Sequence, residues 1–265
     1  MPAPGETGPR GYSLPLSPTG AAAMLTPPPW HFSGEIVMVD YRADPRAVRR
    51  FLPSELDPGP DPGAAAAVFA DWQWCSDSGA EQADPGSCRF GEFLILLGCA
   101  YRGRPMARCA YAWVDSAVPM LRGWVQGMPK QFGEIAQSRP VAVGRAGPRV
   151  AERGRFHGAL SVRGRRVAEA TVTLAGRAAG PPALHTVPLV HTRTFPGWIR
   201  DHPEPRQLVC SEVTDVEFSE VWTGAATLRL SDAADADFPL LAPLEVGDGH
   251  VFSYAETLCA GRLLR

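Results

Sequence analysis

The sequence predicts an α+β fold made mainly of antiparallel strands, with a few short helices. Glycine and proline contribute 27 residues each to a chain of 265, and they recur at short intervals between apolar runs, which favours strands and turns over long helices. Residues 150–174 also alternate apolar and polar side chains on both sides of glycine-containing turns, a pattern typical of an antiparallel meander.

Composition and charge limit the class of protein. A chain of this length with 45% hydrophobic residues can bury one sizeable core. The net charge of −2 arises from 26 basic and 28 acidic residues without long runs, which gives no sign of a nucleic-acid or membrane-surface partner. The apolar stretches at 64–70 and 93–100 are well short of the roughly 18–20 residues that span a bilayer. We therefore expect a cytoplasmic protein.

The chain ends and the metal-binding residue types add two expectations. The first 29 residues are rich in Pro and Gly and lack the basic region and apolar core of a signal peptide, so we expect a flexible arm at 1–29 and a single domain at 30–265. The six cysteines form no C-x-x-C pair, and the six histidines have no H-x-x-x-H or H-E-x-x-H spacing. Reduced, mostly buried thiols are therefore expected, with no metal site and no cofactor.

The elements of the first half follow from local signals. Residues 35–42 form an apolar run with β-branched residues, typical of a strand, and Asp44-Pro45 opens a short helix over 45–52 that stops near Pro53. The next predicted strands are 64–74, 92–101 and 108–114.

A second helix is predicted over 116–127. Asp115 or Ser116 can cap its first turn, and Gly127 suits its C-terminal end. Lys130 would then lie just past the helix, in a stiff turn pinned by Gly127 and Pro129, which can point a side chain into a barrel mouth or cleft.

The second half continues as strands after the meander. A Pro-rich connector at 180–188 leads to strands at 208–221 and 225–230, joined through Trp222-Thr223-Gly224. A strand at 249–254 is expected to run into a final short helix at 255–264.

Lys130 is the only lysine in the sequence, because the other basic residues are all arginines. A guanidinium stays protonated, whereas a desolvated lysine amine can lose its proton and attack a carbonyl to form a Schiff base. The alternative is an exposed lysine without a chemical role.

Several separated motifs resemble the acetoacetate decarboxylase-like superfamily over residue 30 to the C-terminus. They are Tyr41-Arg42-Ala43-Asp44, Phe51-Leu52-Pro53, Gly127-Met128-Pro129-Lys130, Val213-Thr214-Asp215-Val216, the run 220–230 (EVWTGAATLRL), and Pro239-Leu240 with 246–252. The resemblance implies a cone-shaped, largely antiparallel β-barrel in a homo-oligomer. It also implies that Lys130 is the interior Schiff-base lysine and Glu92 the active-site glutamate.

The chain also departs from the decarboxylating members of that family. They carry a second lysine directly after the first, where this chain has Gln131. Lys130 is therefore expected to rely on desolvation by Met128, Phe132 and Trp124. Their arginine and second glutamate near the substrate carboxylate fall at Gly34 and Ala70 here, and Asp71 or Gln73 are candidates to replace that glutamate.

This pattern resembles the non-decarboxylating, aldolase-dehydratase-like branch, which uses the Schiff base on 2-oxo acids such as pyruvate in secondary metabolism. We expect Lys130 to condense with the ketone, Glu92 to move the α-proton, and the enamine to add to an aldehyde or the bound intermediate to lose water. Gln126 and Arg122 are candidates to bind the substrate carboxylate, and Tyr254 is a candidate to offer a hydroxyl to the pocket.

Structural roles remain open for each of these side chains. Glu92 could instead be a solvated acid at a strand end, and Gln126 could be an ordinary polar residue at a helix end. Arg122 could be a surface residue or part of a structural ion pair, and Tyr254 could belong to the barrel wall. The tryptophans Trp72, Trp74, Trp113 and Trp222 are expected to fill the barrel. Two other functions also remain open: decarboxylation of a β-keto acid such as acetoacetate, and a non-catalytic barrel that binds a small carboxylate or a pigment.

Overall fold

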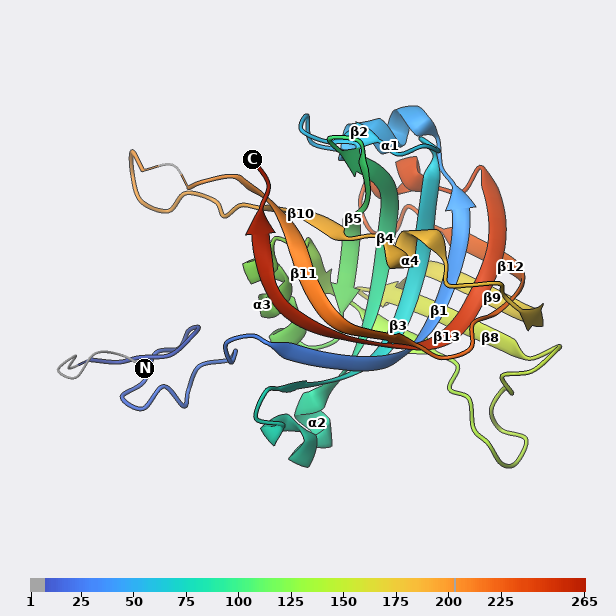
Figure 1. Cartoon of the computed structure of the whole chain (residues 1–265), viewed down its shortest axis with the longest axis horizontal. Coiled ribbons are helices and arrows are strands. Elements are labelled where there is room, and N and C mark those ends of the chain that lie inside the picture. Colours follow the sequence, from blue (N-terminus) through green and yellow to red (C-terminus); the bar gives the residue numbers. More distant parts are fainter. Residues whose placement is uncertain (1–7, 203) are drawn as a thin grey trace.

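The computed structural model describes residues 8–202 and 204–265, and within them one curved sheet of thirteen strands closes on itself (Figure 1). The closed part follows the order β1 (Trp30–Arg42), β3 (Ala64–Ser76), β4 (Arg89–Tyr101), β5 (Arg104–Val114), β10 (Leu189–Arg193), β11 (Gln207–Phe218) and β13 (Glu245–Leu263), and β13 pairs again with β1. Neighbours are antiparallel except for β5 with β10 and β5 with β6. The predicted fold class, a mainly antiparallel barrel, is confirmed.

A second layer branches from the barrel at β13. It runs through β12 (Trp222–Leu230), β9 (Arg165–Arg177), β8 (Arg155–Val162) and β7 (Glu134–Gln137), and it packs across β1, β3, β4 and β5 (Figure 1). The predicted meander at 150–174 is the β8–β9 hairpin of this layer. The two remaining strands pair at the margins, β2 (Asp57–Pro58) with β4 and β6 (Lys130–Phe132) with β5.

β13 joins the two layers because it pairs with three strands. Residues 245–258 pair with β1, while on the other edge 248–251 pair with β12 and 254–263 pair with β11. The helix predicted at 255–264 is therefore wrong: residues 255–258 pair with strands on both edges and residues 260–263 pair with β11, and this tertiary pairing overrides the local signals for a helix.

The alternation of side chains along the strands produces two cores. On β1, Val37 and Val39 face the core between the barrel wall and the second layer, whereas Ile36 and Met38 face the barrel interior. On β4, Phe93 and Ile95 likewise face the second layer. Even-numbered residues of β4 therefore point into the barrel.

The helices are short and lie at the ends of strands. α1 (Pro45–Phe51) is capped as predicted, because the Asp44 carboxylate accepts a hydrogen bond of 2.8 Å from the Arg46 amide. α3 (Ala117–Gln126) ends at Gly127, whose φ of +92° requires glycine. Ser116 occupies the N-cap position without a side-chain hydrogen bond. The other short helices are η1 (Ala80–Ala83), α2 (Pro85–Cys88), α4 (Ala183–Thr186) and η2 (Phe238–Leu241).

Residues 8–29 precede the barrel without a helix or a named strand, and Figure 1 shows them extending away from the barrel body. Leu25, only 1% exposed, attaches the end of this segment to the protein. The arm predicted at 1–29 remains a prediction, and its first seven residues lie outside the described part of the chain.

The six cysteines are free, and four of them are buried: Cys88, Cys99, Cys109 and Cys210. The expectation of reduced, mostly buried thiols is thus confirmed. Across residues 8–202 and 204–265, no helix is long and apolar enough to cross a membrane.

Candidate active site

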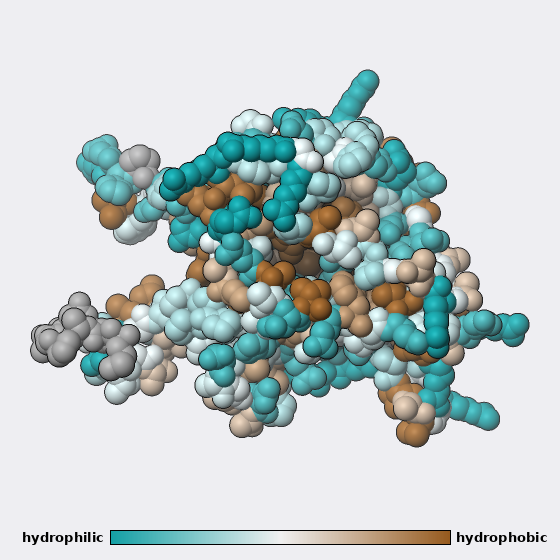
Figure 2. Space-filling view, viewed as in Figure 1, coloured by the Kyte–Doolittle hydropathy of each residue, from teal (hydrophilic) through white to brown (hydrophobic). Residues whose placement is uncertain are grey.

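A cavity of about 670 Å³ occupies the barrel interior, and residues of β10, β11 and α4 form part of its lining. Figure 2 shows a recess near the middle of this face, with apolar side chains at its rim and floor. All five side chains predicted for the site line this cavity: Glu92, Arg122, Gln126, Lys130 and Tyr254.

Lys130 reaches the cavity because α3 and β6 meet at a tight turn. Strand β6 pairs with β5, so that Lys130 lies opposite Ala112, and the Trp124 indole donates a 2.7 Å hydrogen bond to the Lys130 carbonyl. The lysine side chain crosses α3 at Gly123, where a Cβ would lie 2.3 Å from Lys130 Cδ. Its side chain is 6% exposed, so Lys130 is not a surface lysine.

Glu92 is the ion-pair partner of Lys130. Its even position on β4 points it into the barrel, where Oε1 lies 2.7 Å from Lys130 Nζ. The Trp72 indole donates a 2.9 Å hydrogen bond to Oε2, and the Phe90 ring centre lies 5.7 Å from Nζ. The site therefore holds an amine and a carboxylate in contact, shielded from bulk water.

Arg122 is buried in an aromatic enclosure beside the same cavity. Its guanidinium carbon lies 3.8 Å from the Trp74 ring centre, 5.1 Å from Trp30 and 5.2 Å from Phe32. Within the described chain, none of its three side-chain nitrogens has a hydrogen-bond partner. Burial lowers the pKa of Arg122 to about 9, which leaves the group positively charged at neutral pH.

Gln126 and Tyr254 border the cavity with partners of their own. Gln126 lies one helical turn after Arg122, and its amide donates a 3.2 Å hydrogen bond to the Arg122 carbonyl. The Tyr254 hydroxyl donates a 2.7 Å hydrogen bond to Glu256 Oε2.

Glu256 is a cavity residue that the sequence analysis missed. Burial raises its pKa, and the negative charge of Glu92 adds to the effect, against the opposing hydrogen bond from Tyr254 and the charge of Lys130. The incorrect helix prediction hid it, because a strand would have put Tyr254, Glu256 and Leu258 on one face. The site therefore combines one lysine with two carboxyl groups.

The candidates for replacing the family's second glutamate do not reach the cavity. Asp71 Oδ2 instead lies 2.7 Å from Arg139 and 3.3 Å from Arg89, and Gln73 is exposed. Glu256 supplies the second acid from β13 instead.

The surroundings of Lys130 also differ from the expectation. Met128 lines the cavity as expected, but Phe132 is 52% exposed and Trp124 46% exposed. Gln131 is exposed too, because strand alternation turns position 131 away from the Lys130 side chain. Gln131 is therefore not one of the residues that line the cavity.

The four tryptophans divide between the two cores. Trp72 and Trp74 face the barrel interior as expected, whereas Trp113 and Trp222 pack in the core between the layers. For this second pair, the expected position inside the barrel is wrong.

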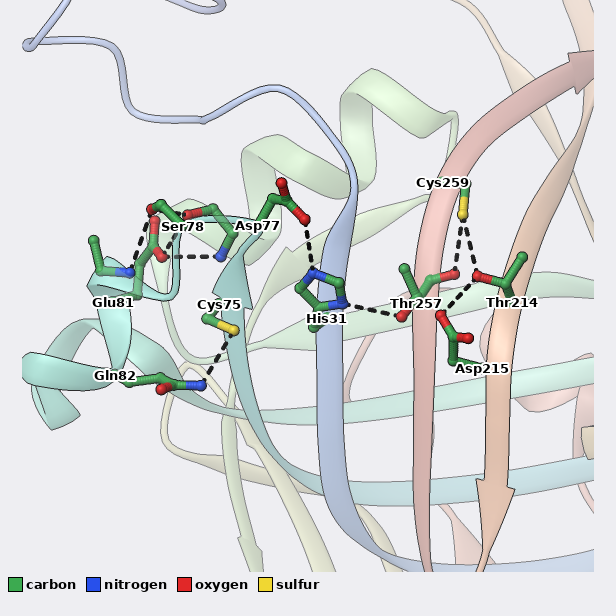
Figure 3. Close-up of polar contacts among 12 residues, drawn as sticks. His31, Cys75, Asp77, Ser78, Glu81, Gln82, Thr214, Asp215, Thr257 and Cys259 are labelled. Atoms are coloured by element: carbon green, nitrogen blue, oxygen red, sulfur yellow. Dashed lines mark hydrogen bonds and ion pairs between the residues drawn. The ribbon is translucent and has the colours of Figure 1, made fainter.

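A second polar cluster lies around β1 and the end of β13 (Figure 3). His31 Nδ1 is 3.0 Å from Thr257 Oγ1, and its Nε2 is 3.6 Å from Asp77. Within the described residues, no group of three or more His, Cys, Asp or Glu side chains is arranged to hold a metal ion.

Comparisons with known proteins identify the family of the chain. The model of the acetoacetate decarboxylase (ADC) family matches residues 13–265. A solved structure of the enduracididine biosynthesis enzyme MppR with HEPES buffer bound is 68% identical, with a TM-score of 0.96, and covers 100% of this chain and 98% of that one. A comparison with curated proteins finds no match.

Two further solved structures are of the same enzyme with ligands. MppR complexed with pyruvate is 69% identical, with a TM-score of 0.94 and coverage of 98% of this chain and 99% of that one. MppR complexed with the condensation product of pyruvate and imidazole 4-carboxaldehyde is 70% identical, with a TM-score of 0.95 and coverage of 98% of both chains. From the family match and these relatives together, the chain belongs to the acetoacetate decarboxylase family.

Proposed function

We propose that this chain is a cofactor-independent, Schiff-base-forming lyase of secondary metabolism. It would catalyse the aldol condensation of a pyruvate-type 2-oxo acid with an aldehyde, with or without loss of water. The observation that carries the proposal is the buried Lys130–Glu92 pair, in one cavity with a charged Arg122 that has no hydrogen-bond partner in the described chain. The pyruvate and condensation-product complexes of MppR support the substrate class.

The first step needs an uncharged amine. Nζ can transfer one proton over 2.7 Å to Glu92 Oε1, which leaves an uncharged amine beside a neutral carboxyl group. The amine then attacks the ketone carbon of pyruvate. Glu92 returns its proton to the departing hydroxyl, so water leaves and a Lys130 iminium remains.

The second step makes the carbon–carbon bond. The Glu92 carboxylate removes a proton from the methyl carbon next to the iminium and gives an enamine, which attacks the aldehyde carbon. Glu256, whose pKa is raised, donates a proton to the aldehyde oxygen. For dehydration, the Glu256 carboxylate formed in this way removes one of the two remaining α-protons, and Glu92 gives the proton it took from the methyl group to the hydroxyl, which leaves as water. Water then hydrolyses the iminium and frees Lys130.

Arg122 favours a 2-oxo acid over decarboxylation of a β-keto acid. A guanidinium without a protein partner is suited to a carboxylate, which it can bind through two hydrogen bonds. Decarboxylation needs the carboxylate to lose its negative charge, and a buried cation opposes that loss. Gln126 is in position to hold the same carboxylate or a substrate hydroxyl.

Reduction with borohydride in the presence of pyruvate tests the Schiff base. Lys130 should gain the mass of one pyruvate, less one water, plus two hydrogens, as measured by peptide mass spectrometry. The Lys130→Arg variant keeps the charge without the nucleophile and should gain nothing. An unmodified Lys130 with every 2-oxo acid tested would exclude this mechanism.

The same preparations distinguish the two other functions. Release of carbon dioxide from acetoacetate at a rate comparable to condensation would identify a β-keto acid decarboxylase. Unchanged carboxylate binding by Lys130→Arg, with no turnover by the wild type, would identify a non-catalytic binding barrel.

We further propose that the protein is a cytoplasmic homo-oligomer. Light scattering would measure the mass of the oligomer in solution.

A further inference from the structure

Part of the cavity is lined by aromatic side chains of α4, β11 and β13. His185 on α4 lies edge-on to three rings, with centroid distances of 4.5 Å to Tyr254, 5.2 Å to Phe252 and 5.9 Å to Phe218. Phe218 lies 4.9 Å from Tyr254. His185, Phe218 and Tyr254 line the cavity, and we call these three side chains the aromatic wall.

His185 is a polar group that the barrel leaves without a partner. Within the described chain the buried Nδ1 has no side-chain hydrogen-bond partner. Burial lowers the pKa of His185 to about 4, so the ring is uncharged at neutral pH. An uncharged imidazole carries one donor and one acceptor nitrogen, so the ring can donate to a ligand or accept from it.

A series of contacts relates the aromatic wall to the reacting nitrogen. Lys130 pairs with Glu92, and Glu92 accepts a hydrogen bond from Trp72. The Trp72 ring is 6.1 Å from Tyr254, which contacts His185.

The volume of the cavity leaves room for a second molecule. Pyruvate has six non-hydrogen atoms, whereas cavities of roughly 300–1,000 Å³ hold drug-sized ligands. The cavity here measures about 670 Å³. A flat ring attached to the aldehyde carbon would fit against the edges and faces of the aromatic side chains.

We propose that the aromatic wall is the aldehyde subsite, and that His185 selects aldehydes with a flat ring bearing a nitrogen that forms a hydrogen bond. This inference rests on the proposed condensation activity and assigns the residue that selects its second substrate. His185 is thereby a specificity-determining residue, and Phe218 and Tyr254 provide the surface on which the ring packs.

The experiment compares two flat aldehydes with pyruvate. Imidazole 4-carboxaldehyde carries ring nitrogens, and benzaldehyde does not. The wild type should condense the first with kcat/KM about tenfold higher, because benzaldehyde leaves the His185 nitrogen unpaired. His185→Leu should abolish this preference, and His185→Gln, which retains a donor and an acceptor, should restore part of it.

The matched control is His157→Leu on β8, which alters an exposed histidine in the second layer and should keep the preference. Equal kcat/KM for the two aldehydes in the wild type, or a preference that survives in His185→Leu, would overturn the inference. If His185→Leu fails to fold, the wild-type ratio and His185→Gln decide by the same criterion. Trapping of the pyruvate imine without condensation of either aldehyde would overturn the subsite alone, whereas absence of the imine would overturn the proposed function.

Discussion

Arg122 is a buried cation whose guanidinium has no hydrogen-bond partner in the described chain. A buried cation without a hydrogen-bonding anion lowers the stability of the free protein, and the aromatic rings around it offset only part of that cost. A substrate carboxylate would supply the missing partner. Binding and stability should therefore respond in opposite directions when this charge is removed.

Arg122→Met tests this opposition. The free energy of unfolding without substrate should rise by about 1 kcal/mol, because the unpaired charge is gone, while KM for pyruvate should rise roughly tenfold or more. Denaturant unfolding and steady-state kinetics measure the two effects. Arg193→Met is the matched control: Arg193 donates to the Val125 carbonyl and to Gln207, so its loss should lower stability. Loss of stability in Arg122→Met with an unchanged KM would make Arg122 a structural cation.

Glu256→Gln tests the role of the second acid through pH. The folded protein holds the Glu256 proton more tightly than the unfolded chain, whose value is near 4.5. Folding stability is therefore lost as pH rises from about that value through the raised pKa of the folded state, at about 1.4 kcal/mol per unit of pKa difference. The variant lacks this loss, so above that range it should be more stable than the wild type, and the difference should vanish at lower pH.

Activity gives the second readout for the same variant. Condensation should fall by about a hundredfold, because a general acid is absent, while borohydride trapping of pyruvate on Lys130 persists. Thermal unfolding across the pH range and the two activity assays measure these effects. A variant whose stability follows the wild type at every pH would show that Glu256 titrates normally.

Among the elements, α3 and β6 fix Lys130 by close packing at Gly123. Alanine is preferred to glycine inside a helix by up to about 1 kcal/mol, so Gly123→Ala should not weaken α3 itself. The new Cβ would lie 2.3 Å from Lys130 Cδ, and it should push Nζ out of contact with Glu92.

The expected result for Gly123→Ala is a loss of about a hundredfold in kcat, because a displacement of about 1 Å has that effect on a positioned reacting group. The fold should remain intact by circular dichroism. Gly176→Ala on β9 is the control, since no atom lies within 4 Å of its added Cβ. Full activity in Gly123→Ala would mean that Lys130 tolerates a different path to the cavity.

The same elements show what local sequence can predict. Local signals predict α1, α3 and most strands. These signals are the cap at Asp44, the helix end at Gly127 and the alternation of side chains along the strands. Glu256 depends on the pairing of β13 with two strands distant in sequence. His185 depends on α4 packing against β4 and β5. No local pattern encodes such contacts, so these cavity residues required the structure.

Over the whole molecule, β1 and β13 belong to both cores. Val37 of β1 and Val251 of β13 pack between the layers, while Ile36 and Phe252 pack inside the barrel. If one core loses its packing, β1 and β13 are disrupted, and the other core then loses its packing as well. We therefore expect the single domain predicted at 30–265, after the arm predicted at 1–29, to unfold as one cooperative unit rather than as two separable halves.

Equilibrium unfolding in denaturant measures this cooperativity. Far-ultraviolet circular dichroism reports all strands, and tryptophan fluorescence reports Trp72 inside the barrel together with Trp113 between the layers. The two transitions should coincide, with one midpoint and one slope. Trp72→Phe and Trp113→Phe each weaken the signal from one core, where Trp74 and Trp222 respectively remain, and the remaining fluorescence should follow the dichroism of the same variant. Separate midpoints would mean that the barrel and the second layer unfold independently, and β13 would then have to detach from one layer while it stays paired in the other.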